Sequence, residues 1–158
     1  MGTAQVLVAG VGNIFLGDDG FGPAVVRQLS SGGGNGVHFI DYGIRGVHLA
    51  YDLLNGWDAL VLVDAIPDRG APGRIEVFHI EPDEGASTHF DGHAMNPEAV
   101  FETVLALGGT MPPTVVVGCQ VESVAEGIGL TAAVAAAVPH AIIAIDTVVA
   151  DLLDRQEV

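Results

Sequence analysis

The sequence has little cysteine and little positive charge. Its 158 residues include one cysteine, Cys119, so no disulfide can form within the chain, and we expect a reducing cytoplasm. Cys119 closes an apolar run and is interpreted as a small buried residue, with a reactive thiol as the alternative. The chain has no lysine, and its formal net charge is −15. We therefore expect neither nucleic acid nor a membrane as partner, because both attract basic proteins, and a cation or a basic protein segment suits the chain better.

Several common signatures are missing as well. We find no apolar run long enough to span a bilayer and no signal peptide at the N-terminus. The Walker A motif, the His-Glu-x-x-His zinc motif and the Gly-x-Ser-x-Gly elbow of serine hydrolases are absent. A dinucleotide fingerprint fails because Phe15 stands where a glycine is required. These absences argue against a nucleotide-binding protein, a serine hydrolase and an ordinary zinc protease.

The sequence does contain apolar runs that alternate with helix-like segments. It is 49% hydrophobic, which is enough for a core, and we expect a single domain over residues 1–158. The alternation predicts a three-layer α/β/α sandwich around a mostly parallel, about five-stranded sheet. We expect strands at 5–10, 37–41, 59–64, 74–80 and 114–119, with 74–80 at or near an edge, and helices at 18–30, 47–54, 97–107 and 131–153, the last kinked or divided at Pro139.

A glycine-rich turn with two carboxylates follows the first expected strand. Residues 10–22 lead from that strand into a helix, which is the usual place for a ligand in an α/β protein. Such turns commonly hold phosphate, but Asp18 and Asp19 would repel phosphate and attract a cation. Asp18 is favoured as the cap of the following helix. That role leaves Asp19 freer to face a ligand.

Further ligands are expected at the same edge of the sheet. Asp64 ends the strand 59–64, and its buried charge needs a metal ion, an arginine or a helix N-terminus as partner. At Asp41, which ends the preceding strand, a turn contact with the backbone is favoured. His89 and His93 lie in the polar stretch before the helix 97–107, and His93 is nearer to that helix. Imidazole together with carboxylates suits nickel or zinc.

Four segments resemble the maturation endopeptidases of nickel–iron ([NiFe]) hydrogenases, in the same order and at fitting spacing. Residues 10–22 resemble the family's N-terminal signature, and 61–65 resemble its strand-ending Asp-Ala motif. His93 falls where the family has its histidine, and 126–131 resemble its late Gly-Ile-Gly-Leu-Thr segment. The resemblance extends from about residue 5 to about residue 150. It implies the phosphorylase/hydrolase-like version of the three-layer fold.

The resemblance also implies a site and a reaction. By position, the metal ligands would be Asp19, Asp64 and His93, with Asp19 where glutamate is often found. Family members remove a C-terminal peptide from the nickel-loaded precursor of the hydrogenase large subunit, so nickel would arrive with the substrate, and zinc or cadmium could occupy the same site. Asp19 or Asp64 would position or activate the attacking water, as in an aspartic-type endopeptidase.

Three further expectations follow from the resemblance. The acidic surface would guide a basic region of the precursor. The chain would act as a monomer in the cytoplasm. A non-catalytic, metal-dependent binding module or chaperone for the large subunit is the alternative function.

Overall fold

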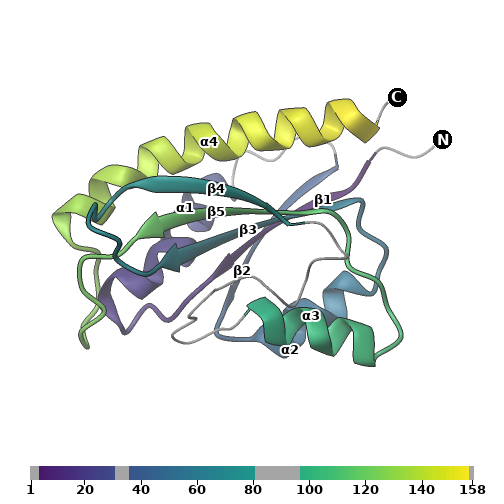
Figure 1. Cartoon of the computed structure of the whole chain (residues 1–158), viewed down its shortest axis with the longest axis horizontal. Helices are drawn as coiled ribbons and strands as arrows, with labels where there is room; N and C mark the ends of the chain where they lie inside the picture. The colour runs from purple at the N-terminus through teal and green to yellow at the C-terminus, as the bar shows by residue number, and fades with distance from the viewer. Residues whose placement is uncertain (1–3, 31–35, 81–96, 157–158) are drawn as a thin grey trace.

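The computed structural model describes residues 4–30, 36–80 and 97–156, which form a sheet with helices on both sides (Figure 1). The sheet has the strand order β2-β1-β3-β5-β4, in which the first four strands are parallel and β4 is antiparallel at the edge. The elements in chain order are β1 (Val6–Val11), the 3-10 helix η1 (Gly17–Gly20), α1 (Phe21–Leu29), β2 (Val37–Gly43), α2 (Gly46–Leu53), β3 (Ala59–Ile66), β4 (Ile75–Ile80), α3 (Pro97–Ala106), β5 (Thr114–Gln120) and α4 (Ala132–Gln156).

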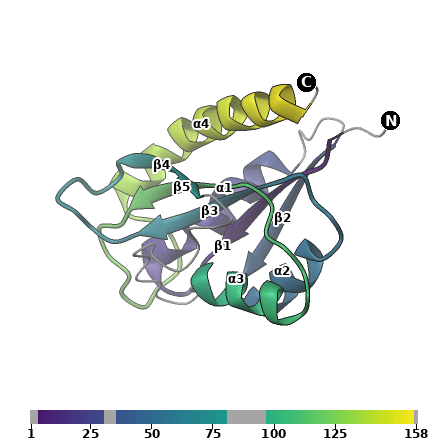
Figure 2. The same cartoon turned by 45° about the vertical axis from the view of Figure 1, so that its right-hand side comes forward.

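Helices cover the two faces of the sheet in pairs. α1 and α4 lie on one face, and α2 and α3 lie on the other (Figures 1 and 2). The central strands are rich in valine, isoleucine and leucine, which suit a sheet that is buried on both faces. The predicted three-layer α/β/α architecture with a mostly parallel sheet is therefore confirmed, and so is the place of residues 75–80 at an edge.

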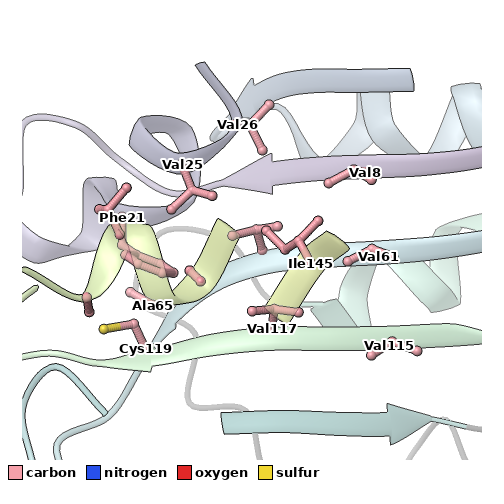
Figure 3. Close-up of a cluster of buried hydrophobic side chains, with 14 of the residues drawn as sticks. Val8, Phe21, Val25, Val26, Val61, Ala65, Val115, Val117, Cys119 and Ile145 are labelled. Atoms are coloured by element: carbon pink, nitrogen blue, oxygen red, sulfur yellow. The ribbon is translucent and has the colours of Figure 1, made fainter. Parts of the chain in front are cut away.

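Alternate residues of each strand supply two separate cores. The core under α1 and α4 includes Val8, Val61 and Val117 from three neighbouring strands, with Phe21 and Ile145 from the two helices (Figure 3). The core under α2 and α3 takes the other residues of the same strands, among them Leu7, Leu60, Leu62 and Val116. This alternation fixes which side chain of β3 can face which layer.

Helix α4 corrects two expectations. It continues without a break through Pro139, so the predicted division there is wrong. Pro139 and Ala135 are both exposed, so water can reach the Ala135 carbonyl that loses its helical partner. By length and composition, the helix over residues 132–155 could also cross a membrane, since an 18-residue window within it has a mean hydropathy of 1.9, although no uninterrupted apolar run predicts this. Only 28% of that window is buried, and the helix packs one stripe of side chains on the sheet: Val134, Val138, Ala141, Ile145 and Leu152.

Candidate active site

Glycines hold the turn after β1 tightly against the start of α1. Gly12 has a φ of +142°, and a Cβ there would lie 1.9 Å from the carbonyl oxygen of Asp19. A Cβ at Gly22 would lie 2.3 Å from the carbonyl oxygen of Val63 and 2.4 Å from that of Val11. Glycine alone permits such a close approach of helix and sheet. This packing carries the two carboxylates of η1 to the carboxyl-terminal edge of the sheet.

Asp19 is fixed by the turn that presents it. Its side chain is buried, with 3% of the residue exposed, and its Oδ2 accepts a hydrogen bond from the backbone N–H of Asn13 at 2.8 Å. This hydrogen bond ties the beginning of the turn 12–19 to the carboxylate at its end. One side of that carboxylate is committed to the backbone, and its charge lies close enough to Asp64 to affect the ionisation of that residue.

Asp64 belongs to β3 and is also buried, with 7% of the residue exposed. Its neighbours Val63 and Ala65 pack in the core under α1 and α4, so alternation turns the Asp64 side chain towards the layer of α2 and α3. β3 continues two residues beyond Asp64, to Ile66, which corrects the expected strand end.

Burial raises the pKa of Asp64 well above its usual value. The negative charge of Asp19 raises this pKa further, while a hydrogen bond from the backbone of Ala65 acts against the rise. No ion pair joins Asp19 or Asp64 to an arginine or histidine within 4–30, 36–80 and 97–156. Two buried carboxylates side by side attract a proton or a cation, and their oxygen atoms are donors that suit a divalent metal ion.

The third expected ligand cannot be placed. His93 and His89 lie outside the described residues, as does the polar segment 81–92. Among the residues that are described, no group of three or more His, Cys, Asp and Glu side chains is placed to hold a metal ion. The described site thus consists of Asp19 and Asp64, and the part played by His93 stays a prediction.

Asp18 has a different role from the one that the sequence predicts. Neither η1 nor α1 has a side-chain cap at its N-terminus, so helix capping by Asp18 is wrong. Instead, Asp18 is fully buried and accepts backbone N–H donors from a distant loop: Glu122 at 2.8 Å, Ser123 at 3.1 Å and Thr131 at 2.7 Å. The Thr131 hydroxyl donates as well, at 2.8 Å. Burial acts to raise the pKa of Asp18, but these hydrogen bonds outweigh it and lower that pKa.

This arrangement was missed because the partners of Asp18 are 104 to 113 residues away. A capping residue and a long-range anchor look alike in sequence, since both are aspartates at a helix start. The available signal was the late segment 126–131, which ends on Thr131. That segment was recognised from its resemblance to the family, without a partner being assigned to it.

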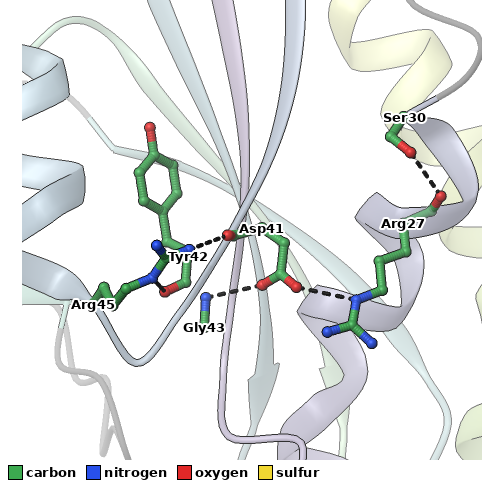
Figure 4. Close-up of polar contacts among 6 residues, drawn as sticks. All are labelled: Arg27, Ser30, Asp41, Tyr42, Gly43 and Arg45. Atoms are coloured by element: carbon green, nitrogen blue, oxygen red, sulfur yellow. Dashed lines mark hydrogen bonds and ion pairs between the residues drawn. The ribbon is translucent and has the colours of Figure 1, made fainter.

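Asp41 makes the turn contact that the sequence predicts. Its Oδ1 accepts the backbone N–H of Gly43 at 2.9 Å, and its Oδ2 accepts the Arg27 Nε–H at 3.1 Å (Figure 4). Arg45 donates to the Asp41 carbonyl at 2.8 Å. The Asp41 carboxylate is therefore occupied by structural contacts, although β2 ends at the same edge of the sheet as the pair Asp19 and Asp64.

Cys119 is the buried residue that the sequence suggests. It is free and fully buried in the core under α1 and α4. Burial, together with the negative charge of Asp18, raises the pKa of its thiol to about 12. A thiol with such a pKa is protonated at neutral pH, which argues against the alternative of a reactive nucleophile.

Comparison with known proteins settles the family. The family model described as hydrogenase maturation protease matches residues 23–147. The chain belongs to the hydrogenase maturation protease family. It is therefore a protease, a kind of hydrolase, and the resemblance found in the sequence is confirmed.

Relatives of known structure share the fold over most of the chain, and a further relative is similar in sequence. The hydrogenase maturating endopeptidase HybD from E. coli has a TM-score of 0.79 and 28% identity, with 93% of each chain covered. A hydrogenase 2 maturation peptidase from Thaumarchaeota archaeon SCGC_AB-539-E09 has a TM-score of 0.72 and 29% identity, covering 92% of this chain and 98% of that one. The coenzyme F420 hydrogenase subunit delta of Methanothermobacter thermautotrophicus is 31% identical over 149 residues, which is 88% of this chain and 90% of that protein.

Proposed function

We propose that this member of the family is an endopeptidase that removes a C-terminal peptide from the nickel-loaded precursor of a [NiFe]-hydrogenase large subunit. The observation that carries the proposal is the pair of buried carboxylates, Asp19 and Asp64, at the carboxyl-terminal edge of the sheet. A divalent cation brought by the substrate relieves the repulsion between them. Family membership as a protease favours this function over a non-catalytic binding module or chaperone.

In this proposal Asp19, Asp64 and His93 bind the nickel ion that the precursor carries. Nickel is then part of the substrate, and zinc or cadmium is expected to bind at the same residues. Asp64 is held by β3, and Asp19 is held through Asn13, so both carboxylates are preorganised for the ion. The same pair would orient or deprotonate the attacking water, which gives an aspartic-type endopeptidase. The bound metal would polarise the scissile carbonyl.

We further propose that the chain works as a monomer of one domain in the cytoplasm, with the precursor as its partner and with no nucleic acid or membrane involved. The net charge of −15 supports this choice of partners, since it repels phosphate backbones and anionic lipids.

The test is processing of the precursor with and without nickel. Purified chain is incubated with nickel-loaded and with nickel-free large-subunit precursor, and the mass of the precursor is followed by mass spectrometry. We expect shortening of the nickel-loaded form alone. His93→Ala should abolish it, whereas Asp41→Asn, which changes a carboxylate at the same edge, should leave it intact. Equal cleavage of both forms would refute recognition through the metal.

A further inference from the structure

Two neighbouring loops expose large apolar side chains beside the carboxylate pair. Phe15, in the turn that leads to Asp19, is 60% exposed, and Ile128, in the loop after β5, is 78% exposed. The loops are joined by two backbone hydrogen bonds: Gly127 N–H to the Phe15 carbonyl at 2.9 Å, and Gly17 N–H to the Gly127 carbonyl at 3.0 Å. The two side chains are thus parts of one surface.

This surface is held firmly although its side chains face water. Asp18 fixes the second loop on both sides of Ile128, at Glu122 and Ser123 before it and at Thr131 after it. The Phe15 N–H bonds to the Asn13 side chain at 2.9 Å. A loop whose only task was to connect β5 with α4 would not need a fully buried carboxylate to hold an exposed isoleucine. Such preorganisation is typical of a binding surface.

The glycines beside Ile128 support the same interpretation. Gly127 and Gly129 have φ values of +147° and +111°, and a Cβ at either position would touch nothing within 4 Å. Close packing therefore does not require glycine at these positions. The backbone path requires it, because other residues rarely adopt such φ values. That path carries Ile128 outwards between its two neighbours.

A groove of about 170 Å³ lies between this loop and helix α1. Its walls include Ile14, Ala24, Ile128 and Leu130, and within the described parts of the chain Arg27 is the one charged residue that lines it. A cavity of about 150 Å³ can hold benzene, so the groove has room for one large apolar side chain. The charge of Arg27 is compensated by its ion pair with Asp41, so this lining favours an apolar, uncharged side chain.

The groove adjoins the proposed metal site. Gly17 and Gly20 of η1 line the groove, and Asp19, between them in sequence, faces Asp64. A protein that delivers a metal ion to Asp19 is therefore brought close to the groove. Once the metal is bound, nearby segments of the same protein are presented at high effective concentration. This continuity selects the metal-carrying substrate as the occupant.

We infer that the groove between α1 and the 127–130 loop docks an extended segment of the metal-carrying precursor, with a large apolar side chain of that segment between Ala24 and Ile128. The inference rests on the proposed function and adds a substrate contact to it. The docked segment is held by apolar contact with Phe15 and Ile128, beside the metal ligands and separate from them. Docking of this kind adds to the affinity for the precursor and leaves the chemistry of the carboxylates unchanged.

The first experiment removes the exposed side chains. The double variant Phe15→Ala/Ile128→Ala is compared with Ile143→Ala, which truncates an equally exposed side chain (64%) on the outer surface of α4. With nickel-loaded precursor as substrate, the double variant should raise KM about tenfold, as expected if the two side chains are among the few that carry the binding energy of an interface. Its kcat should stay the same, because the contact is separate from the reacting groups. Ile143→Ala should match the wild type in both constants.

The second experiment fills the groove. Ala24→Leu places a larger side chain in the groove wall, while Ala135→Leu makes the same change on the exposed face of α4. We expect KM to rise for Ala24→Leu alone. Wild-type KM for both the double variant and Ala24→Leu would overturn the docking groove and leave the proposed function standing. A wild-type chain that neither binds nor shortens nickel-loaded precursor would overturn the proposed function and, with it, the occupant of the groove.

Discussion

Asp18 and Asp64 are two buried aspartates at the same edge of one sheet, and their surroundings are opposite. Asp18 receives hydrogen bonds from three backbone amides and one hydroxyl, and its pKa is lowered. Asp64 faces the charge of Asp19, and its pKa is raised. The first carboxylate is satisfied by the protein itself. The second is disfavoured as an anion, and an added positive charge would favour its ionised form. Burial alone therefore does not distinguish a functional carboxylate from a structural one. The hydrogen-bond donors that surround the carboxylate make that distinction.

The largest effect is expected from Asp64→Asn in the processing reaction. The amide keeps the size of the side chain and removes the charge that binds nickel and orients water. Cleavage of nickel-loaded precursor should fall roughly a hundredfold to ten-thousandfold. The circular dichroism spectrum should remain that of the wild type. Processing at the normal rate by a folded Asp64→Asn variant would place the active site elsewhere.

Asp18→Ala should act on stability instead. It leaves the amides of Glu122, Ser123 and Thr131 without their acceptor, and we expect a loss of about 3–5 kcal/mol in the free energy of unfolding. Asp41→Ala is the matched control, since it removes a partly exposed ion pair with Arg27, and should cost about 1 kcal/mol. Urea unfolding measures both. Equal midpoints for Asp18→Ala and the wild type would contradict the anchoring role.

The two aspartates should also give opposite pH dependences in metal-free protein. The folded pKa of Asp18 lies below the unfolded value of 3.8, so its stabilising contribution is present above 3.8 and is lost as the pH falls through the folded pKa. The folded pKa of Asp64 lies above 3.8. Its most favourable contribution therefore occurs below 3.8 and is lost as the pH rises through the folded pKa.

Unfolding midpoints in the presence of a chelator test these signs. Asp64→Asn should become more stable than the wild type as the pH rises from about 4 to about 8, whereas Asp18→Asn should be less stable, with a deficit that shrinks in acid. The same pH dependence of stability in both variants would show that the two carboxylates have similar surroundings.

The sequence predicts most of the strands and helices, because each depends on a local pattern of apolar and helix-start residues. The apolar runs of β1, β3 and β5 and the helix start at Pro97 were all visible. Features set by distant contacts were not. The role of Asp18 depends on Thr131, and the continuous path of α4 through Pro139 depends on solvent at that face. Asp19 and Asp64 are predictable because parallel strands end at a common edge, which is a property of topology and needs no side-chain detail.

The smallest expected effect concerns Cys119, which lies close enough to Asp18 to be influenced by its charge. With a thiol pKa of about 12, native protein at neutral pH should react with Ellman's reagent far more slowly than unfolded protein does. Asp18→Asn should lower the thiol pKa, since it removes the negative charge that helps to raise it. Rapid labelling of native wild-type protein would show that Cys119 is accessible and ionised.

The hydrogen bonds from Thr131 to Asp18 also set an order for synthesis. The ribosome makes the turn 12–19 before the residues that anchor it, which follow Asp18 by 104 to 113 positions. A nascent chain that stops before Thr131 carries Asp19 and Asp64 but lacks the Thr131 amide and hydroxyl that donate to Asp18. A copy that stops before Thr131 therefore has an incompletely anchored site with which to cut a precursor.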